Sequence, residues 1–446
     1  MRLGEAASAP DALGVRVVVD VRPLQDATRA PATAAYLRAL LGAYAAEPLE
    51  GESFVFLLDL GADDPAGLFP GLPVVGKRRL PITRIFRSGA LTLDPFLVRG
   101  AALGAGRGQA REGGGSGAVA HAVAGALPIG PGLPLVATLL DLAPWELPEQ
   151  YQRSPAARFG QRLRAQLLRE AGAVIVGSAA VGRAATRLLR IRPGRLHVVP
   201  LAGGDAFAPF SMAGTEVGDA QRADLEAERE RYGVPARYFV YTGRHDARHD
   251  LGTLLDALAR LAADGRPPRL AKAIPWPPRI LLVDTTPDDR AAVAQAASAS
   301  GVGDLLHYAP ALPVEQLARL VAGARAAVHP VVSEAAALPV LDALAAGTPV
   351  VASAVGALPE VVGPAGLLVE PRDADRLAHA LRAAWADDRV HRGIAAAAAA
   401  RAGSERRTWS DVARETRAVY ATVAAGREGE SAGRERGSAG SAPAEG

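Results

Sequence analysis

Short β-branched runs alternate with longer stretches rich in alanine, leucine and arginine along most of this chain, and this alternation strongly limits its possible folds. A strand buried on both faces reads as a continuous apolar run, and the helix after it returns the chain to begin the next parallel strand. The pattern occurs in two series separated by a polar segment. We therefore predict an α/β protein with two Rossmann-like, doubly wound domains.

Each series predicts its own set of elements. In the first series, strands are expected at residues 15–19, 54–58, 135–140, 173–176 and 197–199, and helices at 33–44, 156–171 and 179–189. In the second series, strands are expected at 238–241, 279–283, 305–308, 326–329, 350–352 and 366–369. The helices between them are expected at 251–263, 287–300, 314–322, 338–346 and 374–385.

The domain limits follow from length and composition. A chain of 446 residues exceeds the usual size of one hydrophobic core. We expect an N-terminal domain over residues 14–206, a linker with an Arg- and Glu-rich helical part over 207–233, and a C-terminal domain over 234–404. The Gly-rich segment 100–117 is predicted to be a mobile loop, and residues 426–446, which have little apolar surface to bury, a disordered tail.

Composition excludes several classes of protein. The chain has no cysteine, which excludes disulfides, thiolate nucleophiles and Cys-ligated zinc. Its formal net charge is only +3 and its arginines cluster locally, so we expect a local anion site and no nucleic-acid partner. The N-terminal residues lack the charged start and apolar core of a signal peptide, and no run of about eighteen apolar residues occurs. These features favour a cytoplasmic protein.

The most informative motif lies in residues 333–371, SEAAALPVLDALAAGTPVVASAVGALPEVVGPAGLLVEP. Glu334 precedes an apolar run that reads as a helix, and Asp342 lies within that run. A turn at Gly347, a buried-looking strand and a loop with Gly356 follow. A helix N-terminus carries unpaired amides and about half a positive charge, so it suits a phosphate-bearing ligand with polar groups beside it. This layout is typical of a nucleotide-sugar site.

The segment resembles the C-terminal signature of retaining glycosyltransferases of family 4, also called glycosyl transferase group 1, which have the two-domain GT-B fold. The matching positions are Glu334, Leu338, Pro339, Gly347, 349–352, Pro359 and Glu360. Asp342 replaces the second Glu of the family pattern, and alanines at 335–337 replace its glycine-containing triplet. The resemblance implies that Glu334 positions the donor sugar and phosphate, that Asp342 holds ribose hydroxyls, and that Leu338 and Pro339 belong to the donor site.

A second motif, YTGRHDARHDL, begins at Tyr241 and resembles the family element that contacts the donor diphosphate. The matching positions are Gly243, Arg244, Arg248 and Leu251. His249 stands where the family has lysine. Fixed cations lower the barrier because they gain strength as the diphosphate leaves, and an arginine stays charged where a histidine titrates. The resemblance implies catalytic roles for Arg244 and Arg248 and diphosphate binding by Gly243 and His249. The alternative is a set of solvated residues on a turn.

The first half matches the family more loosely. His121 stands where many relatives carry a histidine linked with the acceptor side, which implies a catalytic role. Asp141 lies in TLLDL, which resembles Thr-x-His-Asp-Leu with Leu140 in the histidine's place, and is an acceptor-side candidate. Ser178 ends a strand and is expected to cap the helix after it.

The resemblance also implies an architecture and a mechanism. Residues 405–425 are expected to form a helix that crosses back to an acceptor-side N-terminal domain, while the C-terminal domain binds the donor across a cleft. No metal and no cofactor are expected beyond the nucleotide-diphosphate sugar that is the substrate, and no Asp-x-Asp pair occurs in the motifs. The donor phosphate would accept the proton of a glycan or lipid-linked hydroxyl, with retention at the anomeric carbon. Polysaccharide biosynthesis and mannosyl transfer are the implied setting.

Other readings stay open. Leu140, His249, Asp342 and the alanine triplet depart from the family pattern, which also fits a catalytically degenerate GT-B scaffold that binds a related enzyme. A nucleotide-sugar epimerase or a phosphorylase fits the fold as well. Basic residues at 77–87 and on the helix with Arg158 to Arg169 are either solvated faces or a peripheral contact with the inner membrane face.

Overall fold

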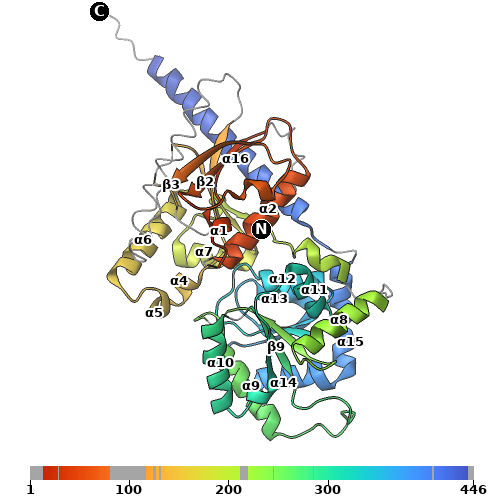
Figure 1. Ribbon diagram of the computed structural model, residues 1–446. Helices are drawn as coiled ribbons and strands as arrows, with labels where there is room; N and C mark the ends of the chain where they lie inside the picture. The colour runs from red at the N-terminus through yellow and green to blue at the C-terminus, as the bar shows by residue number, and fades with distance from the viewer. Residues whose placement is uncertain are drawn as a thin grey trace, which may run out of the picture. The chain divides into compact units, whose positions relative to one another are not determined.

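The computed structural model describes residues 14–28, 30–80, 117–123, 127–129, 132–210, 219–244, 246–284, 286–403 and 406–439. The chain forms two compact units (Figure 1): unit 1 consists of Met1–Pro200 with Ser410–Gly446, and unit 2 consists of Leu201–Trp409. The predicted mobile loop at 100–117 lies outside the described residues except for Gly117, as do residues 81–87 of the first basic stretch.

Unit 1 contains a seven-stranded parallel sheet in the order β3-β2-β1-β4-β5-β6-β7. The strands are β1 (Arg16–Asp20), β2 (Ser53–Asp59), β3 (Val74–Leu80), β4 (Ala118–Val123), β5 (Leu135–Leu139), β6 (Ala173–Val176) and β7 (Leu196–Val198). Two of them were not predicted. β3 is an edge strand with exposed basic residues, and β4 is rich in alanine, so neither reads as a β-branched run.

In the described part of unit 1, three helices were predicted, and three short ones of four residues each were not. They are α1 (Arg22–Gln25), α2 (Pro31–Ala46), α4 (Ala143–Glu146), α5 (Pro148–Tyr151), α6 (Pro155–Glu170) and α7 (Ala179–Leu189), with 3-10 turns η1 (Pro65–Leu68) and η3 (Pro193–Arg195). Ser178 caps α7, because its side chain accepts a hydrogen bond from the amide of Val181. The predicted capping role of Ser178 is confirmed.

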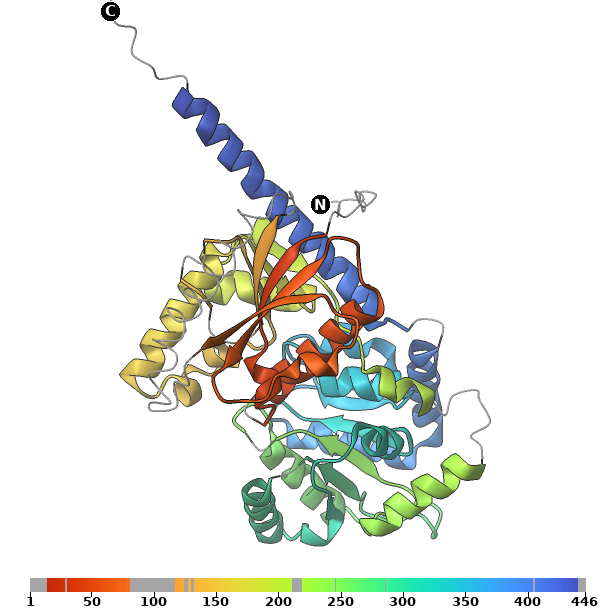
Figure 2. The ribbon, with the colours of Figure 1, turned by 45° about the horizontal axis from the view of Figure 1, so that its top comes forward.

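The long helix α16 (Trp409–Ala439) joins unit 1 from Ser410 onward (Figure 2). Tyr420 on this helix is buried, and its ring is tilted against that of Tyr44. Arg417 makes two hydrogen bonds to the buried carboxylate of Glu52 at 2.9 and 2.7 Å. These contacts attach the predicted crossover helix to the first sheet. The helix includes residues 426–439, for which disorder was expected, since Ala, Glu and Arg have high helix propensity.

Unit 2 contains a six-stranded parallel sheet in the order β10-β9-β8-β11-β12-β13. The strands are β8 (Phe239–Thr242), β9 (Ile280–Val283), β10 (Leu306–Tyr308), β11 (Ala326–His329), β12 (Val350–Ser353) and β13 (Gly366–Val369). Every one of them lies within two residues of its predicted limits. Runs of Val, Ile and Leu that are buried on both faces explain this agreement.

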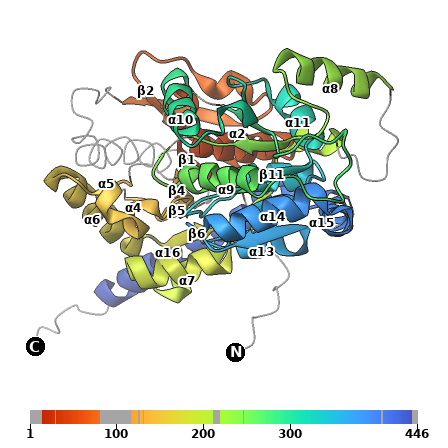
Figure 3. The ribbon, with the colours of Figure 1, turned by 90° about the horizontal axis from the view of Figure 1, so that it is seen from below.

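The helices of unit 2 cover both faces of this sheet. They are α8 (Asp219–Arg231), α9 (Leu251–Ala263), α10 (Pro287–Ala299), α11 (Val314–Ala322), α12 (Leu338–Ala345), α13 (Leu358–Val362), α14 (Ala374–Ala386) and α15 (Asp388–Ala402), with 3-10 turns η4 (Asp205–Phe210), η5 (Gly303–Leu305) and η6 (Gly363–Ala365). α9 and α14 lie side by side (Figure 3), and Trp385 of α14 is fully buried against Phe239. α15 was not predicted.

The segment expected to be a linker, residues 207–233, belongs to unit 2 in the structure. Phe207 is buried, and Glu228 of α8 accepts hydrogen bonds from Arg319 of α11. The chain instead passes between the units at Pro200 and Leu201. The expectation failed because α8 is too polar to be recognised as a packed helix: it is attached through charged groups rather than through an apolar stripe. The predicted class of two doubly wound domains is confirmed by the two sheets.

Candidate functional site

The sheet of unit 2 has a topological switch point, because β8 pairs with β9 on one side and with β11 on the other. Ligands of open α/β sheets bind outside the carboxyl ends of the strands at such a point. Gly243 follows β8 directly, and Pro330 follows β11 directly. The structure therefore brings both predicted motifs to the edge of the sheet where a ligand site is expected.

Backbone hydrogen bonds connect the two motifs. The amide of Asp250 donates to the carbonyl oxygen of Pro330 at 2.9 Å, and the amide of Val332 donates to that of Arg248 at 2.8 Å. His249 and Val331 form an isolated antiparallel bridge between these bonds. The turn with Arg248 and His249 is thus fixed against the loop that leads to Glu334.

Glu334 is a largely buried carboxylate with well-defined partners. Its Oε1 accepts hydrogen bonds from the amides of Ala336 at 3.0 Å and Ala337 at 2.8 Å, and its Oε2 lies 3.0 Å from Nε2 of His329. Burial alone would raise the pKa of Glu334, but the hydrogen bond and charge of His329, the amide of Ala337 and the charge of Arg248 lower that pKa to about 2. Glu334 is therefore ionised at neutral pH and close enough to Arg248 to feel its charge.

The backbone around Glu334 is unusually constrained. Ala337 has a left-handed conformation with φ 54°, which costs an L-residue about 1–2 kcal/mol and turns its amide toward the carboxylate. Gly356 has φ +55°, and a Cβ there would lie 1.7 Å from the carbonyl oxygen of Glu334. The same oxygen accepts a hydrogen bond from the amide of Ala357 at 3.0 Å. The alanine triplet thus still presents two amides to the acid.

The turn before α9 is organised by Asp246. Its Oδ2 accepts from Nε of Arg248 at 3.3 Å and from Nη2 at 2.9 Å, and its Oδ1 accepts from the amide of Arg248 at 2.9 Å. The Nδ1 atom of His249 lies 2.8 Å from the same Oδ1. Burial would raise the pKa of the Asp246 carboxyl, but the hydrogen bonds from His249 and Arg248 hold it well below its usual range. One ionised carboxylate therefore orients both predicted phosphate-binding side chains.

Gly243 and Arg244 form the turn at the end of β8. A Cβ at Gly243 would lie 3.0 Å from the hydroxyl oxygen of Tyr241 and 3.1 Å from Nε2 of His249, so glycine permits a close approach here. The Tyr241 hydroxyl donates to the carbonyl oxygen of Arg244 at 3.1 Å. Burial raises the pKa of Asp284, at the end of β9, and the charge of Arg244 partly offsets this. Arg244 therefore lies between the ends of β8 and β9.

Asp342 projects from α12 toward the first loop of unit 2. Its Oδ1 accepts a hydrogen bond from the amide of Gly204 at 2.7 Å. Burial raises its pKa to about 7, and the hydrogen bond from Gly204 offsets only part of that effect. A Cβ at the neighbouring Gly203 would lie 2.4 Å from the carbonyl oxygen of Leu341, which shows how closely this loop packs on α12. Leu338 and Pro339 form the first turn of the same helix.

His121 lies in the interior of unit 1. Its Nε2 is 2.8 Å from Oγ1 of Thr138, and its Nδ1 is 2.7 Å from the hydroxyl oxygen of Tyr420. Burial lowers the pKa of His121 to about 3, so the ring is neutral. Because both ring nitrogens are bonded within the core, the structure gives this residue a role in holding α16 on β4, and it does not present it to an acceptor.

Asp141 follows β5 and accepts a hydrogen bond from the amide of Ala143 at 2.8 Å, which supports the start of α4. Its charge also acts on Arg164 of α6, whose pKa is lowered by burial and raised in part by Asp141. The guanidinium of Arg164 lies 5.2 Å from the ring of Trp145. Asp141 thus has structural partners within unit 1.

Two residues of the site were missed by the sequence analysis. Asp246 lies inside the recognised motif but matches no family position, and His329 is the last residue of a predicted strand, where it reads as core. His329 is buried, and its ring centroid lies 6.1 Å from that of His249. A polar side chain at the carboxyl end of an otherwise apolar strand is the signal that was available for His329.

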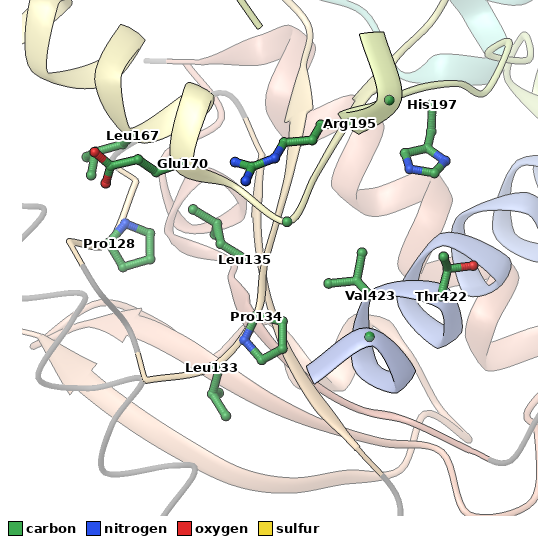
Figure 4. Close-up of a pocket in the computed structure, with 13 residues that line it drawn as sticks. Pro128, Leu133, Pro134, Leu135, Leu167, Glu170, Arg195, His197, Thr422 and Val423 are labelled. Carbon is green, nitrogen blue, oxygen red and sulfur yellow. The ribbon is translucent and has the colours of Figure 1, made fainter. Parts of the chain in front are cut away.

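A cavity of about 570 Å³ opens elsewhere in unit 1 (Figure 4). It lies at the amino ends of β5 and β6, next to the middle of α16. Arg195 on its wall is committed to the carbonyl oxygens of Arg169 and Ala171. Since ligand sites of such sheets lie at the opposite edge, this cavity is not assigned to the site.

Metal-binding clusters and membrane-spanning helices are features of other classes of protein, and both can be assessed over the residues that the structure describes. Nowhere in this part of the chain do three or more His, Asp or Glu side chains gather in a way that could hold a metal ion. Among the same residues, each helix is too short or too polar to span a bilayer.

Comparison with known proteins defines the class first. The fold resembles that of sucrose-phosphate synthase from Thermosynechococcus elongatus, with a TM-score of 0.66 and 22% identity over 92% of this chain and 100% of that one. It also resembles Anabaena HepE in complex with UDP and glucose, with a TM-score of 0.62 and 18% identity over 92% and 100% of the two chains. The protein has the GT-B fold, as predicted.

The sequence of unit 2 is also similar to that of known proteins. Residues 236–387 match the family model described as glycosyl transferases group 1. The MMP alpha-(1->4)-mannosyltransferase of Mycolicibacterium hassiacum is 42% identical over 27% of this chain and 30% of its own length. The D-inositol 3-phosphate glycosyltransferase of Streptomyces griseus is 32% identical over 65% and 62%. The chain thus spans less than two thirds of these relatives. The match to the glycosyl transferases group 1 model lies within unit 2, and it agrees with the predicted resemblance.

Proposed function

We propose that this protein is a retaining, metal-independent glycosyltransferase that moves a sugar from a nucleotide-diphosphate donor to a hydroxyl group of a glycan or a lipid-linked acceptor. The observation that carries the proposal is the turn of Asp246, Arg248 and His249, fixed by backbone hydrogen bonds against the loop of Glu334 at the switch point of unit 2. Cations and the ionised carboxylate of Glu334 meet there, with a second carboxylate, Asp246, orienting the cations, as recognition of a diphosphate and its sugar requires.

The proposed mechanism assigns a task to each group. The acceptor oxygen forms a bond to the anomeric carbon on the face that the diphosphate leaves, the bond from that carbon to the phosphate oxygen breaks, and the acceptor proton passes to the leaving phosphate. Arg244, Arg248 and His249 stabilise the negative charge that grows on the diphosphate. Glu334, held by two amides and His329, orients the donor sugar.

The test measures donor binding and donor cleavage separately. Calorimetry with UDP, GDP and ADP identifies the base, and release of nucleoside diphosphate from a panel of mannose and glucose donors identifies the sugar. Glu334→Gln and Arg248→Gln are expected to lower kcat/KM by about 10²-fold or more, because each removes a charge that acts on the transition state. Glu315→Gln on α11 and Arg376→Gln on α14, both exposed, serve as matched controls.

Two outcomes would contradict the proposal. Nucleotide affinity that is unchanged in Arg248→Gln, together with donor cleavage that is unchanged in Glu334→Gln, would show that the site lies elsewhere. Tight nucleotide binding without turnover on every donor and acceptor would favour a catalytically degenerate scaffold.

The lipid-linked class of acceptor is supported by the outer face of α6. Phe159 is 57% exposed there and is flanked on the same face by exposed Arg158 and Arg162. An aromatic side chain among arginines suits an anionic membrane surface. Flotation with vesicles that contain anionic lipid is expected to recover the protein, and Phe159→Ser with Arg162→Glu is expected to abolish recovery. Arg187→Glu on α7 is the charge control, and equal flotation of all variants would refute the contact.

A further inference from the structure

His249 stands in the phosphate-binding turn where the family has lysine. Its contact with Asp246 determines which of its two ring nitrogens carries the hydrogen. Oδ1 of Asp246 lies 2.8 Å from Nδ1 of His249. An ionised carboxylate can only accept hydrogen bonds, so Nδ1 must carry the hydrogen of this bond. The neutral ring is therefore held as the Nδ1–H tautomer, and Nε2 is the nitrogen that gains or loses a proton.

The position of Nε2 is also defined. A Cβ at Gly243 would lie 3.1 Å from it, so Nε2 faces the backbone turn where the proposed diphosphate binds. The ring is held there by contacts on both sides, with ring centroids 6.2 Å from Tyr241 and 6.1 Å from His329. In the neutral tautomer Nε2 offers a lone pair, which repels a phosphate oxygen. Only the protonated ring donates a hydrogen bond from that position.

Charged groups around the ring act in opposite directions. The carboxylate of Asp246 favours the imidazolium, and the guanidinium of Arg248, held by the same carboxylate, opposes it. His329 faces His249 from β11 but is itself bonded to Glu334, and Tyr241 faces it from β8 with its hydroxyl bonded to a backbone carbonyl. A bound diphosphate adds two negative charges to this balance and favours the imidazolium.

We infer that Asp246 is a positioning residue that makes donor binding proton-coupled: His249 Nε2 takes up a proton from solvent when the diphosphate binds, and Asp246 stabilises the resulting imidazolium. The inference rests on the proposed function and deepens it. A lysine in the same place would be charged already and would need no proton. The affinity for donor is therefore predicted to depend on pH in this protein, through one identified nitrogen.

The experiment is calorimetry with an intact nucleotide-diphosphate sugar, in buffers that differ in ionisation enthalpy. The intact donor is used because its phosphates are diesters, whereas the terminal phosphate of a free nucleoside diphosphate titrates near pH 6 and would obscure the proton count. Wild-type protein is expected to take up between about half and one proton at about pH 7.5. Its affinity is expected to fall by up to about tenfold per pH unit above that pH.

Variants separate proton coupling from a merely structural role. His249→Lys is expected to bind without proton uptake and with an affinity that is flat from about pH 6 to 8. Asp246→Asn is expected to weaken binding about tenfold at pH 7.5 and to move the loss of affinity to lower pH. In the His249→Lys background the same substitution should cost distinctly less. Asp250→Asn is the matched control, because that carboxylate accepts from the amide of Arg372 instead.

The outcomes distinguish a failure of the proposed function from a failure of the inference about Asp246 and His249. If no nucleotide sugar binds at any pH, the proposed function fails and the inference fails with it. If wild-type protein binds donor with no proton uptake from about pH 6 to 8, the inference is overturned and the proposed function stands. An equal cost of Asp246→Asn in both backgrounds, with no shift in pH dependence, would reduce Asp246 to a support for the turn. The wild-type proton count decides the matter even if a variant does not fold.

Discussion

Replacement of Asp342 by asparagine should stabilise unit 2 at alkaline pH and have little effect in acid. The carboxylate of Asp342 accepts a hydrogen bond from the amide of Gly204 at 2.7 Å, and burial raises its pKa to about 7 from an ordinary 3.8. An asparagine has the same shape and keeps an acceptor oxygen for that amide. The substitution therefore removes the cost of a buried charge and preserves the hydrogen bond.

The sign and size of the effect follow from linkage. The folded-state pKa of Asp342 lies above the unfolded one, so its protonated form stabilises the fold below about pH 4, and that stabilisation is lost as the pH rises through about 7. A difference of about 3 pKa units corresponds to about 4 kcal/mol. Because the residue is only partly buried, water screens some of this cost. We expect Asp342→Asn to gain about 2–4 kcal/mol at pH 8 and about zero at pH 4.

The assay is urea unfolding at a series of pH values, followed by tryptophan fluorescence in a Trp145→Phe background. That background removes the tryptophan of unit 1, and the remaining ones, at 276, 385 and 409, all belong to unit 2. Asp342→Ala is the contrasting variant: like Asp342→Asn it removes the buried charge, but it leaves the Gly204 amide without its acceptor, so it should be less stable than Asp342→Asn by about 1–3 kcal/mol at every pH. Parallel pH profiles of wild-type protein and Asp342→Asn would refute the reasoning.

Three further perturbations test the constraints that build the two units. Gly356→Ala places a methyl group 1.7 Å from a backbone carbonyl oxygen at φ +55°, so thermal unfolding should show a loss of more than about 3 kcal/mol in the free energy of unfolding. Gly252→Ala in α9, where the space around the residue is open, should raise the free energy of unfolding by about 0.5–1 kcal/mol. Arg417→Met leaves the buried carboxylate of Glu52 unpaired and should cost unit 1 about 3–5 kcal/mol, seen as faster hydrogen exchange in α16; unchanged exchange would contradict this. Ser178→Ala should cost about 1 kcal/mol through the lost cap and leave nucleotide affinity unchanged, and a loss of affinity would give Ser178 a further role.

The fold was predictable where a buried element has a distinctive amino-acid composition. The strands of unit 2 are runs of Val, Ile and Leu buried on both faces, and the sequence marks each of them. β4 is equally buried but consists largely of alanine with His121, and β3 is an edge strand with exposed basic residues. Neither strand therefore contains the run of Val, Ile and Leu by which a buried strand is recognised. α15 was missed for a related reason, because alanines supply its buried face and leave no apolar period to detect.

The site was predictable only in part, because its residues act through geometry as well as through identity. Glu334 and Arg248 were found as motif positions, and the structure brings their motifs together. The partners that hold them were not found. Asp246 matters because a tight turn places its two oxygens between Arg248 and His249, and His329 matters because β11 ends opposite the loop of Glu334. Neither relation can be read from spacing in a single sequence.

Two departures from the family pattern are compensated by the groups that surround them in the structure. The alanine triplet still gives two amides to Glu334, because Ala337 takes the left-handed conformation that glycine adopts most easily. His249 is still oriented toward the turn at Gly243, because Asp246 holds its Nδ1 and leaves its Nε2 facing that turn. In both places a lost residue type is compensated by a neighbouring group that restores the same electrostatic role. Compensation of this kind favours an active transferase over a degenerate scaffold, because a scaffold has no need to keep the charge of the site.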